Sequence, residues 1–338
     1  MTAIEQVDET RVKDLAERLR RGERRALSQA VTLVESSRAD HRAEAEALLT
    51  ALSGDVGGAL RIGLTGTPGV GKSSFIERFG GLITASGLKV AVLAVDPTSA
   101  RTGGSILGDK TRMEKLARDP NAYIRPSPAG AALGGVARRT REAILLCEAA
   151  GYDVVLVETV GVGQSETMVS DMTDLFILLI APAGGDELQG VKRGVMELAD
   201  LILVNKADGD LKPQAMATVA DYKSALRLMA ARPGDPPDVP DVMPVSAMSG
   251  EGLEQAWERM SAVDAWRRAE GWRDATRRKQ AALWLRYALE RGLIDAFDAD
   301  PSARAAFKAL AAEVEQGALT AEVAAGRALR AFLNSGDG

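Results

Sequence analysis

The chain has almost none of the residues that build disulfides and thiol-rich or histidine-rich metal sites. Its 338 residues include one cysteine and one histidine. A lone cysteine excludes an internal disulfide and a multi-cysteine metal site. Cys147 lies in an apolar helical stretch, so we expect it to be buried as a small hydrophobic side chain. His41 lies among arginine and glutamate residues, where a surface role is favoured over catalysis.

Positive charge in excess is also missing, since the net charge is −5, and this argues against a nucleic acid as the main partner. The basic stretches 18–25 and 267–278 are interrupted by acidic residues, so we expect them to be solvated helix faces. The first ten residues lack an apolar signal segment. The apolar run Leu175 to Ala181 is too short to span a bilayer. We therefore expect a cytoplasmic protein with no membrane partner.

What the chain does contain is an alternation of apolar runs and helical stretches through its middle. Continuous apolar runs separated by helices predict a parallel sheet covered on both faces, in an α/β fold. The flanking residues 11 to about 53 and 262 to 335 carry helical periodicity without a strand signal. The runs expected to be strands are 61–65, 89–96, 122–125, 153–158, 174–181, 200–205 and 242–245.

A glycine-rich motif, GTPGVGKS, occupies Gly66 to Ser73 between an expected strand and an expected helix. Backbone N–H groups of such a loop turn toward phosphate oxygens, and the N-terminus of the next helix adds its positive end. We expect Lys72 to bridge the β- and γ-phosphates of a nucleoside triphosphate and Ser73 to hold Mg²⁺. The other predicted phosphate contacts are Pro68, Gly69, Val70, Gly71 and Ser74.

A second motif, Asn205 to Asp208 (NKAD), follows another expected strand. A carboxylate at Asp208 only accepts hydrogen bonds, and guanine offers it two donors where adenine offers none, so GTP is favoured over ATP. Asn205 is expected to brace the loop, and the aliphatic stem of Lys206 to cover the base. Ser246, Ala247 and Met248 follow the last strand, and we expect their backbone N–H groups to contact the guanine oxygen.

Acidic residues at strand ends are the candidate metal ligands. Asp96 and Glu158 each follow a buried run, and Asp109 is a further candidate in a loop. Because Mg²⁺ keeps several waters, one or two carboxylates together with Ser73 and phosphate oxygens suffice to hold it. Strand-end placement favours Asp96 and Glu158 over Asp109. No tightly bound organic cofactor is expected, and GTP is the substrate.

Three further segments carry a resemblance to a known family: Asp96 to Ser99 (DPTS), Glu158 to Glu166 (ETVGVGQSE) and Pro182 to Gly190 (PAGGDELQG). Around the same phosphate loop, over about residues 60 to 250, they resemble the methylmalonyl-CoA mutase-associated GTPases, the MeaB group, labelled ArgK in older usage. The resemblance implies a P-loop GTPase domain with a parallel sheet, flanked by N-terminal and C-terminal helical extensions. It also implies a SIMIBI-class metallocofactor chaperone that forms a homodimer through its C-terminal helices.

The same resemblance implies that the client is an adenosylcobalamin-dependent methylmalonyl-CoA mutase. The GTPase would gate the loading of the cofactor into this mutase and protect it from inactivation. We accordingly divide the chain into an N-terminal helical extension (1–55), a P-loop GTPase domain (56–261) and a C-terminal helical dimerisation arm (262–338). A simple helical cover over the nucleotide domain is the alternative for the last segment.

The predicted catalytic residues are Lys72, Gln164 and Lys192. No glutamine directly follows Gly161, and Gln164 lies further along, so intrinsic hydrolysis should be slow and accelerated by a partner. A correctly placed cation is worth roughly 10³ to 10⁵ in rate in other GTPases. Lys192, Arg193 and Arg101 are candidates for that cation, and the resemblance places Lys192 in a partner-responsive segment.

Other SIMIBI GTPases are the alternative, either protein-targeting or metal-inserting. A targeting GTPase would favour a basic or methionine-rich face, which the acidic balance and ten scattered methionines do not supply. Metal insertion generally needs a histidine-bearing or cysteine-bearing site, and His41 and Cys147 are far apart in the sequence. A kinase interpretation, suggested by the older label, lacks any visible base for a substrate hydroxyl.

Overall fold

The computed structural model describes residues 7–36, 38–95, 113–126, 133–159, 165–182, 193–229 and 232–335. The chain forms two compact units, Met1–Arg278 and Lys279–Gly338, with helix α13 (Trp272–Ala299) running from the first into the second. The functional division at 55/56 and 261/262 stays a proposal. No helix in the described segments is both long enough and apolar enough to cross a membrane.

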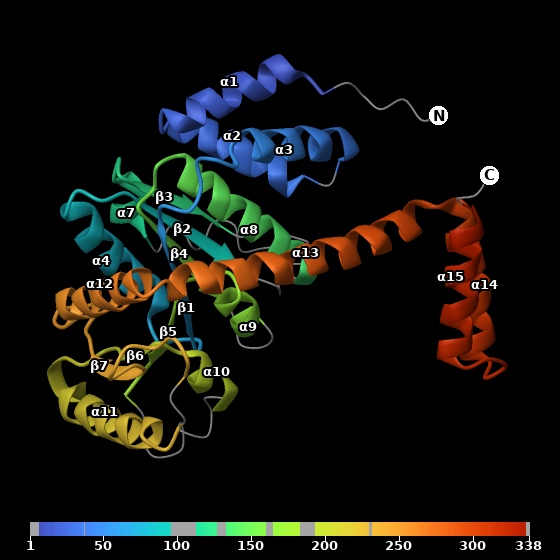
Figure 1. Cartoon of the computed structure of the whole chain (residues 1–338). Coiled ribbons are helices and arrows are strands. Elements are labelled where there is room, and N and C mark those ends of the chain that lie inside the picture. Colours follow the sequence, from blue (N-terminus) through green and yellow to red (C-terminus); the bar gives the residue numbers. More distant parts are fainter. Residues whose placement is uncertain are drawn as a thin grey trace. The chain divides into compact units, whose positions relative to one another are not determined.

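The first unit is built on a seven-stranded sheet in the order β3-β2-β4-β1-β5-β6-β7, in which every neighbouring pair is parallel (Figure 1). This confirms the predicted α/β class, the parallel sheet and its strand segments. The strands are β1 (Leu60–Gly66), β2 (Val90–Val95), β3 (Ala122–Arg125), β4 (Val154–Thr159), β5 (Leu175–Ile180), β6 (Leu201–Val204) and β7 (Asp241–Pro244).

Helices cover both faces because successive side chains of a buried strand point to opposite sides. In β5, Ile177 and Leu179 join a core formed with α4 (Lys72–Ala85), α7 (Glu114–Arg118) and α12 (Leu253–Ala269). Leu178 and Ile180 point the other way, toward α10 (Arg193–Leu198) and α11 (Lys212–Leu226). Helices α8 (Leu133–Ala149) and α9 (Ser165–Ser170) also pack on the sheet, and α8 buries Cys147 as expected.

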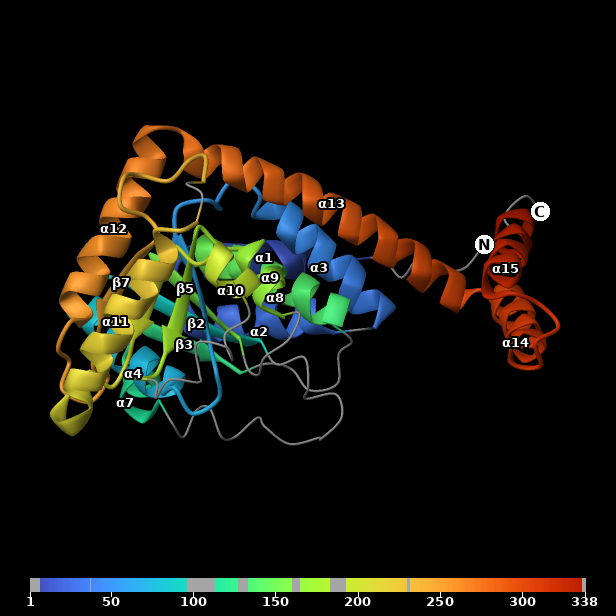
Figure 2. The same cartoon turned by 90° about the horizontal axis from the view of Figure 1, so that it is seen from below.

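The N-terminal segment is helical, as predicted, but it is divided into three helices, α1 (Glu9–Arg20), α2 (Arg24–Glu35) and α3 (Ala39–Ala51). The first break falls at Gly22, whose φ of 73° is a left-handed value that favours glycine. These helices lie beside α8, and α2 packs on it (Figure 2). Arg42 pairs with Glu142 of α8 at 3.3 Å, which ties the segment to the sheet-bearing part of the unit.

In the second unit, the end of α13 is followed by α14 (Pro301–Glu315) and α15 (Ala321–Ser335), so the predicted helical character of this segment is confirmed. Asp300 caps α14 by accepting hydrogen bonds from the backbone N–H groups of Ser302 and Ala303, at 2.7 and 2.9 Å. Inside this unit, the ring of Phe297 contacts Phe332, with centroids 5.5 Å apart.

A buried ion network lies at the amino ends of β1 and β5. The Asp174 carboxylate accepts hydrogen bonds from Arg277 at 2.6 and 2.7 Å and from the backbone N–H of Arg61 at 2.9 Å, and Arg273 lies 3.7 Å away. The expectation that 267–278 is a solvated face is therefore wrong. Arg273 and Arg277 pair with Asp174, about a hundred positions earlier in the sequence, and Arg277 also pairs with Glu148.

Loss of the Asp174 carboxylate should destabilise the first unit strongly. Burial disfavours its charge, yet Arg277, Arg273 and the Arg61 N–H outweigh burial and hold the pKa of Asp174 below its usual value. Because Asp174→Ala removes the carboxylate that two buried guanidinium groups share, we expect the apparent free energy of unfolding at pH 7 to fall by about 3 kcal/mol in urea titrations. The loss should shrink as the pH falls below about 4, where the wild-type carboxylate becomes protonated in turn.

The matched control is Asp14→Ala, because Asp14 pairs with Arg18 at 3.4 Å while 63% exposed. Exposed pairs contribute little, so we expect a change within about 0.5 kcal/mol. Equal urea midpoints for the two variants would contradict a stabilising role for the network.

The outer edge of β7 offers few groups for pairing. The backbone N–H of Asp241 donates to the Asp200 carbonyl, and that of Val245 donates to the Val204 carbonyl in β6. In the parallel ladder, the backbone N–H positions of Val242 and Pro244 therefore point away from β6, toward the edge of the sheet. The N–H of Val242 is taken by the Asp241 side chain at 2.7 Å, and Pro244 has no N–H. Gly252 packs on the Pro244 carbonyl so closely that a Cβ there would lie 2.4 Å from the oxygen.

Candidate nucleotide-binding site

The phosphate-loop motif forms the connection between β1, which ends at Gly66, and α4, which begins at Lys72. Gly69 and Gly71 have φ values of 81° and 94°, which side-chain-bearing residues rarely adopt. A Cβ on Gly71 would also lie 2.9 Å from Asn205 Nδ2. The first N–H groups of a helix have no partners within it, so the start of α4 presents donors and a positive end, as an anion site requires.

The Lys72 ammonium lies against the loop itself. Its Nζ donates to the carbonyl oxygen of Gly66 at 2.6 Å, with the Thr67 carbonyl 3.5 Å away. Burial lowers the pKa of Lys72, and the nearby negative charge of Glu158 partly opposes that shift. The predicted phosphate lysine and the predicted metal-ligand acid therefore lie close enough to affect each other's charge.

Glu158 lies near the end of β4, in register with Leu64 of β1 and Ala94 of β2, and is buried. Its neighbour Thr159 donates to the hydroxyl of Thr65 at 2.9 Å, which fixes the end of β4 beside the start of the phosphate loop. This hydroxyl pair is part of the site that the sequence motifs did not indicate.

The residues present fit a magnesium ion. Ser73, half-buried in the first turn of α4, brings a hydroxyl, and Glu158 brings a carboxylate. Oxygen ligands of this kind suit Mg²⁺ when phosphate oxygens and waters complete the shell. Within the described ranges there is no group of three or more histidine, cysteine or acidic side chains that would hold a metal alone. The other predicted ligands, Asp96 and Asp109, lie outside the described residues.

Asn205 joins the phosphate loop to the turn after β7. It directly follows β6 and is buried, and its Nδ2 donates to the Val70 carbonyl at 2.9 Å. Its Oδ1 accepts the backbone N–H of Ala247 at 3.0 Å. Lys206 adds a second tie, since its Nζ donates to the Gly69 carbonyl at 2.9 Å and leaves its stem lying between the two motifs. The predicted bracing by Asn205 is therefore present in the geometry.

Asp208 is oriented by the same turn. Ser246, which is fully buried, donates its hydroxyl to Asp208 Oδ1 at 2.7 Å, and that hydroxyl accepts the Ser249 N–H at 3.0 Å. We expected the backbone N–H groups of Ser246, Ala247 and Met248 to contact the guanine oxygen. The Ser246 N–H instead donates to the Glu251 carbonyl and the Ala247 N–H to Asn205 Oδ1, so only the contact through Met248 stays a prediction.

The structure thus brings together the phosphate-loop residues and Ser73, Asn205, Lys206, Asp208 and Ser246, at the carboxyl ends of the parallel strands. This is where open α/β sheets bind ligands. Two predicted catalytic residues, Gln164 and Lys192, lie outside the described residues. Sequence reasoning missed Arg78 of α4, which donates to the carbonyls of Met248 and Ser249 at 3.3 and 3.2 Å. No motif marks a surface arginine of this kind.

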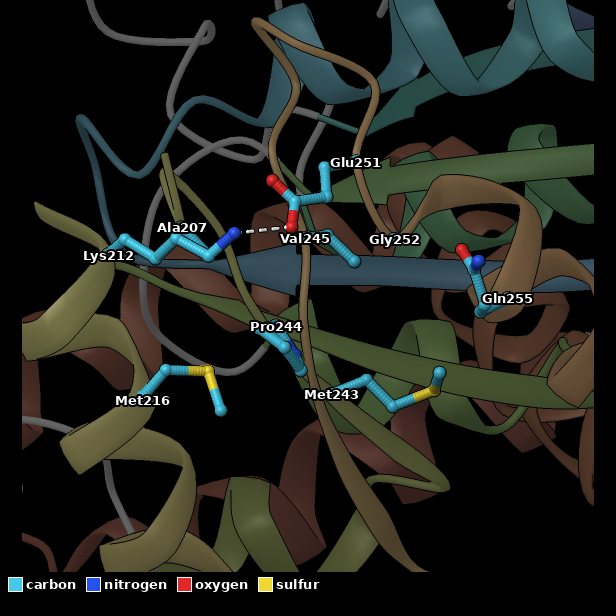
Figure 3. Close-up of a pocket in the computed structure, with 9 residues that line it drawn as sticks. All are labelled: Ala207, Lys212, Met216, Met243, Pro244, Val245, Glu251, Gly252 and Gln255. Carbon is cyan, nitrogen blue, oxygen red and sulfur yellow. Dashed lines mark hydrogen bonds and ion pairs between the residues drawn. The ribbon is translucent and has the colours of Figure 1, made fainter. Parts of the chain in front are cut away.

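A pocket of about 410 Å³ adjoins the NKAD segment at Ala207, between α11, β7 and α12. Lys212 reaches toward Glu251 at 2.6 Å, and Met216 and Met243 also line the pocket (Figure 3). Ala207 is the one pocket residue from the NKAD motif, and no phosphate-loop residue lines this pocket. It is therefore a neighbour of the nucleotide site and not its phosphate-binding part.

Comparison with known proteins agrees with this geometry. The family model described as "Methylmalonyl Co-A mutase-associated GTPase MeaB" matches residues 27–302. A protein of Caulobacter vibrioides that carries the name GTPase is 51% identical over 321 residues, which cover 95% of this chain and 98% of the relative. The mouse "Methylmalonic aciduria type A homolog, mitochondrial" is 46% identical over 324 residues, covering 92% and 77% of the two chains.

Among solved structures, one described as a LAO/AO transport system kinase superposes with a TM-score of 0.74 at 37% sequence identity. The match covers 98% of this chain and 100% of that one. The phosphate loop and Asn205 to Asp208 both lie within residues 27–302, the range that the family model matches.

Proposed function

The chain belongs to the MeaB family of methylmalonyl-CoA mutase-associated GTPases, and on that premise we propose that it binds and hydrolyses GTP to gate delivery of adenosylcobalamin to a methylmalonyl-CoA mutase, which it also protects. The observation that carries the nucleotide part is Asn205, which joins the phosphate loop at Val70 to the base-side turn at Ala247. One side chain thereby fixes the spacing between the phosphate site and the base site.

In the proposed reaction a water oxygen attacks the γ-phosphorus, a new P–O bond forms, and the bond to the β–γ bridging oxygen breaks. Lys72, released from the Gly66 carbonyl by phosphate oxygens, neutralises the charge that builds on the leaving β-phosphate. Mg²⁺ held by Ser73 and Glu158 would supply further positive charge to the phosphates. Gln164 and Lys192 are our proposed water-positioning and charge-stabilising residues.

Base selection follows from Asp208. Its carboxylate, held by the Ser246 hydroxyl, would accept the N1–H and the exocyclic amine of guanine. Adenine would leave the same carboxylate without a donor, and buried unpaired groups of this kind are penalised heavily. We therefore propose GTP and GDP, rather than adenine nucleotides, as the ligands.

A second copy of this chain is our proposed partner for the C-terminal unit. Within Lys279–Gly338, large apolar side chains are widely exposed, including Leu285 at 71%, Leu289 at 62% and Leu333 at 68%. Exposed apolar side chains gathered in one small unit mark an association surface. The family resemblance supports a homodimer formed through these helices.

The partner proposal predicts mutase-stimulated turnover. Without an obvious built-in water-positioning group, the isolated protein should hydrolyse GTP slowly. Adding methylmalonyl-CoA mutase should raise the rate at least about tenfold, which is well below the roughly 10³ to 10⁵ that a positioned cation can supply. Phosphate release is measured with the mutase in its apo and adenosylcobalamin-loaded forms, and ATP serves as the nucleotide control.

Two outcomes would count against this proposal: equal turnover with and without mutase, and failure of the proteins to co-elute in any nucleotide state. Lys192→Ala tests the catalytic assignment in the same assay. It should lose most of the stimulation by the mutase. Unchanged stimulation in that variant would remove Lys192 from the mechanism while leaving the chaperone role intact.

A further inference from the structure

Two threonine hydroxyls tie β1 to β4 at the carboxyl edge of the sheet. Thr159 Oγ1 donates to Thr65 Oγ1 at 2.9 Å, and both residues are buried. The ladder between these strands has Leu64 and Glu158 as its last pair, so the hydroxyl bond joins the next residue of each strand. One residue later, at Gly66, β1 ends and the phosphate loop follows.

The two strand ends are paired further on their other sides than they are with each other. The end of β4 pairs with β2 as far as Thr159, which is in register with Val95. The end of β1 pairs with β5 as far as Gly66, which is in register with Leu179. Between β1 and β4, the hydroxyl bond therefore continues the connection beyond the backbone ladder and sets how far apart the two ends lie.

Each of these ends carries part of the candidate magnesium site. Glu158 is on β4, and β1 leads through the phosphate loop to Ser73 at the start of α4. Side chains of a strand alternate between the two faces of a sheet. Leu156 of β4 is in the core formed with α4, so the Glu158 side chain is on that face and Thr159 is on the opposite one. The hydroxyl pair therefore acts on the site through the backbone.

We propose that Thr65 and Thr159 are positioning residues for the metal, which keep the Glu158 carboxylate and the Ser73 hydroxyl at the separation that one Mg²⁺ ion requires. This inference rests on the proposed function. Mg²⁺ demands near-ideal octahedral geometry with ligands at about 2.0 to 2.1 Å, so it tolerates a displaced ligand poorly. Loss of the pair should therefore weaken the metal's contribution to nucleotide binding and leave metal-free binding unchanged.

The test uses the double variant Thr65→Val/Thr159→Val, which replaces both hydroxyls by methyl groups of similar shape. Removing both partners of a buried hydrogen bond is nearly neutral for folding, whereas each single substitution takes a partner from the remaining hydroxyl and should lower the urea midpoint. The affinity for fluorescent GDP is measured over a Mg²⁺ titration and in EDTA. We expect the double variant to need about fivefold more Mg²⁺ for half-maximal tightening, the scale of one hydrogen bond. Its GDP affinity in EDTA should stay within about twofold of wild type, because the metal contributes nothing there.

Two further variants serve as controls. Thr159→Ser keeps the hydroxyl and should keep the wild-type Mg²⁺ requirement. Thr140→Val should do so too, because Thr140 is a buried threonine on α8 whose hydroxyl donates within its own helix, to the Val136 carbonyl at 2.8 Å. A double variant with the wild-type Mg²⁺ requirement would overturn the positioning role. So would one whose GDP affinity falls as much in EDTA as in Mg²⁺.

The proposed function is tested separately, on the wild-type protein alone. Equal affinities of this protein for GDP and ADP would contradict the proposed function, whatever the threonine variants do. A wild-type GDP affinity that does not respond to Mg²⁺ would overturn the positioning role and leave guanine recognition intact.

Discussion

Asp208→Asn is expected to reverse the base preference, from guanine toward xanthine. An asparagine amide offers one donor and one acceptor, so it cannot accept both the N1–H and the amine of guanine. Xanthine carries an oxygen in place of the amine and matches the amide. We expect GTP affinity to fall by roughly 10² to 10³, and the XTP-to-GTP affinity ratio to rise by about 10⁴, the scale on which sites built around hydrogen bonds discriminate.

The measurement is a competition titration against fluorescent GDP with both triphosphates. Asp210→Asn is the control. Asp210 is an exposed acid two residues further along the chain, so this substitution removes the same charge outside the predicted base contact. It should change neither affinity by more than about twofold. If Asp208→Asn has the same XTP-to-GTP affinity ratio as the wild-type protein, Asp208 does not recognise the base. The hydroxyl of Ser246, which now donates to Asp208, can donate equally well to the asparagine oxygen, so the loop geometry should survive.

Lys72→Met should abolish most GTP turnover and leave the fold intact. Its Nζ is the cation inside the phosphate loop, 2.6 Å from the Gly66 carbonyl, where phosphate oxygens would compete for it. Loss of one fixed donor to developing charge costs roughly 10² to 10³ in rate, so turnover should drop about a thousandfold. Methionine has nearly the same length, and burial already lowers the pKa of Lys72, so its replacement by a neutral side chain should not unfold the protein.

Single-turnover phosphate release at saturating GTP separates chemistry from binding for this variant. Lys115→Met is the control, since Lys115 is an exposed lysine on α7 outside the nucleotide site. It should retain wild-type turnover. Turnover by Lys72→Met within tenfold of wild type would exclude Lys72 as the principal phosphate cation.

Much of the fold could be predicted because its signals are local. Each buried parallel strand is a short, continuous apolar run, as Leu175 to Ile180 is, and glycines mark the phosphate loop where φ is positive. The sequence pattern also placed Asn205 correctly at the carboxyl end of a strand. The order of the strands has no such local signal, because it depends on which runs pair in space.

Contacts between distant segments account for what sequence reasoning missed. The arginines after Arg267 look solvated when read with their immediate neighbours, yet Arg277 is neutralised by Asp174 from 103 positions away. Arg78 and the turn it holds are 170 positions apart at Met248. Side chains of this kind carry no motif, and only the folded chain brings their partners together.

The outer edge of β7, which offers few groups for pairing, has a consequence for the association of copies of this protein. A sheet edge with unpaired donors is a template on which strands of other chains polymerise, and natural proteins suppress it. Here the Asp241 carboxylate occupies the Val242 donor, proline removes the next donor, and Gly252 covers the Pro244 oxygen. Even at high protein concentration, this edge should therefore resist the addition of strands from other copies, which is a route to fibres. Substituting Pro244, or enlarging Gly252, would be the first place to look for aggregation.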